Sequence, residues 1–357
     1  MKKIVFRVDS SNEIGTGHVM RCLTLAGRLK KECDITFICR DLEGNIGQLI
    51  KNANFTLIYL SGVQNEKNLK GYENWIKVKQ KTDALQTVGK IKEKIDCLII
   101  DNYAIDAEWE TILEPCAKKI MVIDDLANRK HSCDMLLDQN YNFSLEKRYN
   151  NLVIPDCRLF LGPKYALLRE EFLLAHKRPR KKVAKIERIL LFFGGIDPNN
   201  ETLKVLKAIM LFDEKLIVDV VVGVNNPHNM QIKTFCEKFS NINFHCQINN
   251  MAELMNKADI CIGAGGAATL EKCFMLLPSI VIAVAENQIS GSEALDAIGC
   301  IDYLGGSETV NSDAIKNSLQ YYADMPHKLA EMSTSCERLF NGYEFAELEI
   351  KNAILDC

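Results

Sequence analysis

The sequence predicts an α/β protein with two Rossmann-like domains that face a cleft. The chain has 357 residues, and at about 150 residues per domain this length suggests two domains. Short apolar runs alternate with amphipathic stretches in both halves, a rhythm typical of parallel sheets covered by helices. A polar segment lies between the halves. We therefore predict a first domain over residues 1–176, a linker over 177–188 and a second domain over 189–357.

Six apolar runs in the first half are predicted to be strands: Lys3–Val8, Ile35–Cys39, Phe55–Leu60, Cys97–Asp101, Ile120–Asp124 and Met135–Leu137. Between the first two runs lies an amphipathic stretch that is predicted to be a helix. Its apolar face repeats at spacings of three and four residues and consists of Val19, Cys22, Leu23, Ala26 and Leu29.

Four apolar runs in the second half are predicted to be strands: Ile189–Phe193, Leu216–Val222, Ile260–Ile262 and Ser279–Ala283. The segment before the first of them, Lys177–Lys182, is basic and contains proline, and Lys185 and Arg188 follow it. A basic patch of this kind can bind nucleic acid, but a solvated linker between domains has the same composition. Domain boundaries favour such polar segments, so we interpret it as a linker.

Charge and cysteine usage exclude several classes of protein. The 44 Lys and Arg residues against 47 Asp and Glu give a formal net charge of −3, whereas a general nucleic-acid binder needs a basic surface. The 14 cysteines occur in apolar runs and form no Cys-x-x-Cys pair, as is typical of reduced intracellular proteins. No apolar run approaches the ~18 residues of a membrane span. We expect a soluble cytoplasmic protein with no nucleic-acid or membrane partner.

The turn after the first predicted strand, Asp9–His18, carries the first candidate for chemistry. Its glycines, Gly15 and Gly17, allow a tight turn and a close approach of the backbone to a ligand. A helix that begins near His18 disfavours the imidazolium form, so a neutral His18 is available as a base. A histidine that only caps the helix or contacts a ligand is the alternative.

This turn is not a nicotinamide-binding motif. That motif requires a third small residue at position 20, which Met20 occupies here. The sequence also contains no Gly-x-x-x-x-Gly-Lys-Ser/Thr phosphate loop. The commonest dehydrogenase and nucleoside triphosphatase functions are therefore not expected.

A second predicted strand ends in the polar residues Asp101, Asn102 and Tyr103. Asp101 could orient His18, and Tyr103 could form a hydrogen bond with water or a sugar. Strand ends are also often polar simply because they leave the core, which is the alternative interpretation.

A third predicted strand ends in Asp124 and Asp125, and paired carboxylates invite interpretation as a metal site. However, the six histidines show no helical metal-ligand spacing, and His131–Cys133 is too short a cluster to indicate a metal site. We therefore expect neither a metal ion nor any other cofactor.

Two glycine turns in the second half have a form compatible with phosphate binding. Gly194 and Gly195 follow its first predicted strand, and Gly265 and Gly266 lead from a later strand toward Ala268 in a helix. The backbone amides of such a turn could cradle a diphosphate. Glycines that serve only close packing of helix and strand are the alternative.

Three polar residues near these turns are further candidates. Glu271 lies one turn into the helix after the second glycine turn, where it could accept hydrogen bonds from a ribose or simply be solvated. Asn287 and Gln288 follow the next predicted strand, and the amides there could bind a sugar or a phosphate. The first half thus offers a base and the second half a nucleotide-binding site.

Several motifs occur in the order found in one known enzyme family. They are Phe6–Ser11 followed by Ile14–His18, Leu42–Asn45, Asp101–Tyr103, Tyr165–Phe172, Phe193–Asp197 and Gly265–Glu271. With them the chain resembles, from about residue 3 to about residue 345, the UDP-sugar hydrolases of pseudaminic acid biosynthesis. That family acts on UDP-2,4-diacetamido-2,4,6-trideoxy-β-L-altropyranose and is part of the glycosyltransferase-B superfamily. Asn102 stands where some members have a histidine.

The resemblance implies a glycosyltransferase-B fold whose carboxy-terminal domain holds UDP. It implies a metal-independent, inverting reaction in which water attacks C1 of the sugar and UDP leaves. His18 would be the general base and Tyr103 would help position the water. The residues implied as substrate contacts are Arg169, Glu271, Asn287 and Gln288. A glycosyltransferase that uses a UDP-amino sugar donor, and a catalytically silent UDP-sugar sensor, are the alternative functions.

Overall fold

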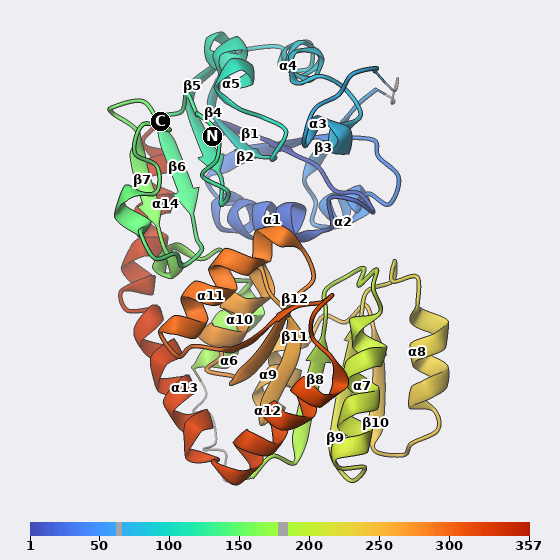
Figure 1. Ribbon diagram of the computed structural model, residues 1–357. Helices are drawn as coiled ribbons and strands as arrows, with labels where there is room; N and C mark the ends of the chain where they lie inside the picture. The colour runs from blue at the N-terminus through green and yellow to red at the C-terminus, as the bar shows by residue number, and fades with distance from the viewer. Residues whose placement is uncertain (62–65, 178–184) are drawn as a thin grey trace. The chain divides into compact units, whose positions relative to one another are not determined.

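The computed structural model describes residues 1–61, 66–177 and 185–357, which form two compact α/β units. Unit 1 comprises residues 1–140, 144–167 and 342–357, and unit 2 comprises residues 141–143 and 168–341. Each unit has a sheet of parallel strands with helices on its faces (Figure 1). The predicted α/β class, with two Rossmann-like domains, is confirmed. No helix in the described ranges is long and apolar enough to span a bilayer.

The sheet described for unit 1 has seven strands in the order β3-β2-β1-β4-β5-β6-β7, all paired in parallel. The strands are β1 Lys2–Val8, β2 Cys33–Arg40, β3 Thr56–Leu60, β4 Ile95–Asp101, β5 Ala117–Ile123, β6 Met135–Asp138 and β7 Arg158–Leu161. Its helices of four or more residues are α1 Gly17–Leu29, α2 Gly47–Asn52, α3 Glu73–Ile76, α4 Gln80–Val88, α5 Ala107–Leu113 and α14 Tyr343–Leu355. Because the strands are parallel, their carboxyl ends meet at one edge of the sheet.

Successive side chains of β1 pack into two different apolar layers of unit 1, one on each face of the sheet. Phe6 packs in the layer that contains α1 and α14, and Val5 packs in the layer that contains α4 and α5. The buried face of α1 includes Leu25, whereas Leu23 is only partly buried. The predicted apolar face of this helix is therefore correct except that Leu25, at position i+3 from Cys22, packs more deeply than Leu23.

The sheet described for unit 2 has six parallel strands in the order β10-β9-β8-β11-β12-β13. The strands are β8 Arg188–Phe192, β9 Ile217–Val222, β10 Ile242–Cys246, β11 Ile260–Ala264, β12 Ser279–Ala283 and β13 Asp302–Gly306. The helices are α6 Glu170–His176, α7 Glu201–Phe212, α8 Asn229–Cys236, α9 Met251–Lys257, α10 Ala267–Phe274, α11 Ile289–Ala297, α12 Ser312–Asp324 and α13 His327–Leu339.

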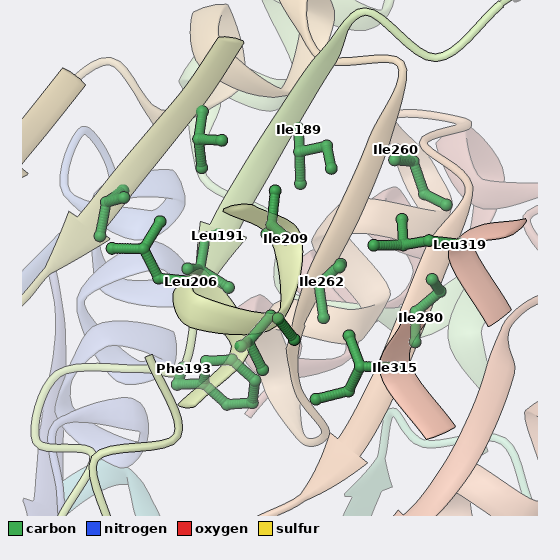
Figure 2. Packing of buried hydrophobic residues seen from close by; sticks show 14 of the residues in the cluster. Ile189, Leu191, Phe193, Leu206, Ile209, Ile260, Ile262, Ile280, Ile315 and Leu319 are labelled. Atoms are coloured by element: carbon green, nitrogen blue, oxygen red, sulfur yellow. The ribbon is translucent and has the colours of Figure 1, made fainter. Parts of the chain in front are cut away.

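One face of this sheet packs against α7 and α12. Leu191 of β8 lies beside Ile262 of β11, and Ile189 lies beside Ile260. Leu206 of α7 and Ile315 of α12 belong to the same cluster (Figure 2). Successive strand residues point to opposite faces. Leu190, Cys261 and Val281 are also fully buried, so the second face is covered too.

The boundaries of unit 2 differ from those of the predicted second domain at both ends. The α14 helix belongs to unit 1, where Ala346 and Ile350 are in the apolar layer of α1 and Glu349 pairs with Arg158. Residues 168–176, predicted to be in the first domain, belong to unit 2, where Phe172 of α6 is buried. Of the predicted linker, residues 178–184 lie outside the described residues.

Strands β7, β10 and β13 were not predicted. They lie at the outer edges of the two sheets, and several of their residues are only partly buried. An edge strand needs a weaker apolar pattern than a central one, because neighbours cover less of it. Their sequences therefore lack the continuous apolar runs of the central strands.

Candidate active site

The turn between β1 and α1 is fixed at its first residue by a buried carboxylate. Asp9 accepts hydrogen bonds from the backbone N–H of Arg40 at 2.6 Å and from Asn102 Nδ2 at 2.8 Å. Its Oδ1 also pairs with Arg7 at 2.7 Å. The turn is thereby tied to β2 and to the end of β4. Asn102 thus holds the turn that precedes His18.

The two glycines of this turn, Gly15 and Gly17, differ in backbone conformation and in surroundings. Gly15 has φ +80°, in the left-handed region that favours glycine, and its N–H donates to the carbonyl of Ser11 at 2.9 Å. A Cβ at Gly17 would meet no atom of the described residues within 4 Å. Open space therefore lies beside the first residue of α1.

His18, in the first turn of α1, makes a short contact with the carboxylate at the end of β4. Its Nδ1 lies 2.6 Å from Asp101 Oδ1, and both side chains are buried. Burial opposes ionisation of Asp101, but Arg21 and His18 outweigh it and hold the pKa of this carboxyl well below its usual range. The ionised carboxylate accepts the Nδ1 proton, so Nε2 of a neutral imidazole carries the lone pair. The structure brings together the two residues that the sequence paired.

Tyr103 lies beside His18, with its ring edge-on and the ring centroids 4.6 Å apart. Its hydroxyl donates to Asp125 Oδ1 at 2.5 Å. Burial, together with the charge of Asp125, raises the pKa of Tyr103 well above its ordinary value. The hydroxyl therefore stays protonated, and its oxygen retains lone pairs that can accept a hydrogen bond from water.

Two residues of this cluster, Arg21 and Asp125, were not among the predicted site residues. Arg21 Nε and Nη2 donate to the two oxygens of Asp101 at 2.6 and 2.7 Å, and Nη1 donates to Asp125 Oδ2 at 2.9 Å. The sequence indicated Asp125 only as half of a carboxylate pair. A signal for Arg21 was its place three residues after His18, on the buried side of an amphipathic helix.

Aromatic rings from α3 and the residue before it extend this cluster. The rings of Tyr72 and Trp75 lie 5.3 and 5.8 Å from that of Tyr103. Both are partly exposed. No periodic pattern in the sequence singles out this short helix, which is why it was missed.

Asp124 has different hydrogen-bond partners from Asp125 and is part of a second buried network. Its Oδ1 accepts from Arg129 Nη1 at 2.7 Å, and its Oδ2 accepts from the hydroxyl of Tyr149 at 3.0 Å. His131 Nδ1 contacts Glu110 Oε1 at 2.6 Å. The adjacent carboxylates of the sequence thus belong to different networks.

In unit 2, the turn Gly265–Gly266 leads from β11 into α10. Gly266 has φ +83°, which favours glycine, and a Cβ on Gly265 would lie 2.9 Å from Ser292 Oγ. Within the described residues, no side chain caps the start of α10, and Gly266 and Ala267 are exposed. The first amides of this helix, including that of Ala268, are therefore open to a ligand.

The other glycine turn, after β8, is different. The carboxylate of Asp197 accepts hydrogen bonds from the backbone amides of Glu201 and Thr202 at 2.9 Å each. It therefore caps the start of α7 and occupies these two amides. Gly194 has φ +87°, and a Cβ on Gly223 would lie 2.2 Å from the carbonyl oxygen of Gly195. Gly194 thus provides the positive φ of the turn, and the backbone of Gly195 packs closely against Gly223.

Arg169 and Glu271, predicted as separate substrate contacts, form an ion pair. Arg169 Nε and Nη2 lie 3.0 and 3.3 Å from the two carboxylate oxygens of Glu271, and Arg169 also pairs with Glu171 at 2.6 Å. Burial raises the pKa of Glu271, although Arg169 opposes that shift. The two N–H groups of Arg169 that bind both carboxylate oxygens fix Glu271 in one orientation on α10.

Gln288 packs beside the α10 turn, and its Oε1 accepts a hydrogen bond from the backbone N–H of Val284 at 3.0 Å. A Cβ on Gly265 would lie 3.0 Å from the Cβ of Gln288. Asn287, the preceding residue, is exposed. The predicted site residues near α10 thus gather within unit 2, and His18, Asp101 and Tyr103 gather within unit 1.

Comparison with known proteins supports the family resemblance that the sequence motifs predict. Residues 189–343 match the glycosyltransferase family 28 C-terminal domain. The chain is similar to the UDP-2,4-diacetamido-2,4,6-trideoxy-beta-L-altropyranose hydrolase of Campylobacter jejuni, with 29% identity over 289 residues, 81% of this chain and 94% of that protein. It is also 28% identical over 333 residues, 91% of this chain, to an uncharacterized protein of Methanocaldococcus jannaschii, of which it spans 62%. The resemblance expected from the motifs is confirmed.

Solved structures are similar over the whole chain. The MurG structure of Acinetobacter baumannii has a TM-score of 0.64 at 12% identity and covers 100% of both chains. The Anabaena HepE structure in complex with UDP and glucose has a TM-score of 0.60 at 12% identity, also over 100% of both chains. At such identities the likeness shows the fold alone. The predicted glycosyltransferase-B fold is confirmed.

Proposed function

We propose that this chain hydrolyses a UDP-linked 2,4-diacetamido-2,4,6-trideoxy sugar to the free sugar and UDP, without a metal ion and with inversion at C1. The observation that carries the proposal is the 2.6 Å contact between His18 Nδ1 and Asp101, which leaves Nε2 as a base at the carboxyl edge of a Rossmann-like sheet. The name of the Campylobacter relative supports the choice of substrate.

In the proposed reaction, a water oxygen forms a bond to C1 of the sugar while the bond from C1 to the diphosphate oxygen breaks. The bonding electron pair leaves with UDP, and the water proton passes to His18 Nε2. Tyr103, whose hydroxyl proton is directed at Asp125, accepts the second hydrogen of the water. General base catalysis of this kind contributes about 10²- to 10⁴-fold.

Unit 2 supplies the proposed nucleotide-binding residues. The open amides at the start of α10 bind the diphosphate and stabilise the charge that develops on it as the bond breaks. Glu271, held by Arg169, accepts hydrogen bonds from the ribose hydroxyls. Amides supply positive potential locally, so a chain with a net charge of −3 can bind a dianionic group.

Release of UDP in the absence of any acceptor tests the proposal. The purified chain is incubated with a small panel of UDP-diacetamido sugars, and UDP is measured. We expect release from the 2,4-diacetamido-2,4,6-trideoxy sugar, and a rate at least 100-fold lower for His18→Ala, with UDP affinity retained. No release from any member of the panel would overturn the proposal.

The match of residues 189–343 to a glycosyltransferase domain favours one second candidate, transfer of the sugar from UDP to an acceptor. The same assay separates the two functions. A glycosyltransferase releases UDP at a substantial rate only when its acceptor is added, whereas the proposed hydrolase needs none.

A further inference from the structure

The guanidinium of Arg21 lies between the two carboxylates that hold the reactive side chains of unit 1. Nε and Nη2 donate to both oxygens of Asp101, and Nη1 donates to Asp125. Asp101 then contacts the imidazole of His18 at 2.6 Å. Asp125 accepts a hydrogen bond from the hydroxyl of Tyr103 at 2.5 Å. Side chains from α1 and from the ends of β4 and β5 thus converge on one cation.

We propose that Arg21 is a positioning residue. Its rigid guanidinium holds the carboxylates of Asp101 and Asp125 at a fixed separation, and this sets the distance between the imidazole of His18 and the hydroxyl of Tyr103. This inference rests on the proposed hydrolytic function. A guanidinium is planar, and its five N–H donors point in fixed directions. The two carboxylates that it binds therefore cannot shift independently. The imidazole contacts Asp101 Oδ1, which also accepts from Nη2, and the phenol donates to Asp125 Oδ1, so the two groups are held at a fixed spacing as well.

The charges of the cluster require a cation at this position. Asp101 is fully buried and Asp125 nearly so, and two carboxylates in a medium of low polarity repel each other. Burial disfavours the charged form of Arg21, yet both carboxylates outweigh it and raise the pKa of the guanidinium well above its ordinary value. The cation that joins the carboxylates is thus permanently present.

The place of Arg21 on α1 makes the coupling direct. It follows His18 by three residues, so both side chains leave the same face of one helix. Its Nη2 also lies 3.2 Å from His18 Nδ1, which already directs its proton at the closer Asp101 oxygen. A displacement of the guanidinium would therefore release the imidazole and the Asp125–Tyr103 pair together.

Two variants of Arg21 separate positioning from charge. Arg21→Lys keeps a positive charge but replaces the planar fork by a single ammonium group, which cannot bond both oxygens of one carboxylate and reach the other in the same geometry. Arg21→Gln removes the charge as well. We expect kcat to fall about 10- to 100-fold in Arg21→Lys, by analogy with the loss seen when a residue that orients a metal-binding side chain is replaced, with KM changed less than about threefold.

Arg40→Lys is the matched control. Arg40 is a fully buried arginine of the same unit whose guanidinium pairs with Asp83 at 2.6 Å and contacts none of the four side chains around Arg21. Its backbone N–H, which donates to Asp9, is retained in the lysine variant. Its replacement also removes a buried guanidinium and lowers stability. We expect kcat of the folded Arg40→Lys protein to stay within about twofold of the wild-type value.

A double-variant cycle tests whether Arg21 acts through the base. If it does, Arg21→Lys in a His18→Ala background should lower the residual rate far less than it lowers the wild-type rate. A loss of the same factor in both backgrounds, or a loss in Arg40→Lys equal to that in Arg21→Lys, would overturn the positioning role.

A readout without substrate keeps the inference separate from the proposed function. Nitrogen and proton NMR of the imidazole, assigned by comparison with His18→Ala, should show a proton on Nδ1 in a strong hydrogen bond in the wild type and in Arg40→Lys. That signal should be shifted or lost in Arg21→Lys and Arg21→Gln. An unchanged signal would contradict the positioning role, whereas absence of UDP release by the wild type would contradict only the hydrolytic function.

Discussion

His18 and Asp101 are 83 positions apart in the sequence, yet Nδ1 of the imidazole lies 2.6 Å from Oδ1 of the carboxylate. The contact joins the first turn of α1 to the last residue of β4, the strand that pairs with β1. A parallel sheet produces this meeting, because the carboxyl ends of adjacent strands share one edge. The contact fixes which nitrogen of the imidazole is free.

Replacement of Asp101 by Asn should preserve the shape of this pair and reverse its hydrogen bonding. An amide group can donate to Nδ1, which would move the imidazole proton to Nε2 and remove the base. We expect kcat for UDP release to fall about 10²- to 10⁴-fold, as such a change of tautomer does in a catalytic triad. Calorimetry should find UDP affinity unchanged. An Asp101→Asn protein with a rate near that of the wild type would contradict the assigned role of Asp101.

Asn102 should matter for stability. Its Nδ2 donates to Asp9 Oδ2 and its Oδ1 accepts from the backbone N–H of Ala104 at 2.9 Å. Asn102→Ala leaves a carboxylate oxygen of buried Asp9 without this donor, so we expect the free energy of unfolding to fall by about 1–3 kcal/mol. Denaturant unfolding measures the loss. Gln48→Ala, which removes an exposed hydrogen bond to Asn52, is the control and should cost less than about 0.5 kcal/mol.

Gly266 should be required for UDP binding. At φ +83° an alanine is strained, and relief of that strain would move the first amides of α10. We expect Gly266→Ala to weaken UDP binding about tenfold or more in a calorimetric titration. Gly306→Ala is the control, because Gly306 has no positive φ and a Cβ there would meet no described atom within 4 Å. Equal UDP affinity in the two variants would contradict the diphosphate site at α10.

Asp138 should make stability depend on pH. Burial, together with the charge of Asp125, raises the pKa of the Asp138 carboxyl to about 7. Between about pH 4 and pH 7 the folded protein then binds a proton that the unfolded chain has released. This contribution to stability is complete below about pH 4 and is lost as the pH rises through 7, by up to about 1.4 kcal/mol per pH unit.

The test for Asp138 is a comparison of unfolding free energies across this pH range. Asp138→Asn cannot ionise, so the stability of the wild type relative to the variant should decline between pH 4 and pH 7. A difference that is constant over this range would show that Asp138 titrates alike in the folded and unfolded states.

The central strands and the positions of His18, Asp101 and Tyr103 could be predicted because their signals are local. The runs around Phe6 and Ile99 are continuous and apolar, and His18, Asp101 and Tyr103 lie at strand ends or shortly after them, where parallel sheets place ligands. Polar residues at such positions are identifiable without knowledge of their partners.

The role of Arg21 could not be predicted in the same way. Its partner Asp125 is 104 positions away, and a charged residue on an otherwise apolar helix face is explained only when that partner is known. The same holds for α14. The contact of Glu349 with Tyr165 spans 184 positions, and nothing local in the sequence indicates that the last helix joins the first unit.

Hydrolysis in ¹⁸O-labelled water tests the central claim most directly. The purified chain is given the UDP-linked 2,4-diacetamido-2,4,6-trideoxy sugar with no acceptor and no added metal, and both products are examined by mass spectrometry at early times. Attack of water at C1 predicts that ¹⁸O enters the sugar and that the released UDP carries none. Label in the UDP, with an unlabelled sugar, would show that water attacks phosphorus and would contradict the proposed role of His18 as the base for attack at C1.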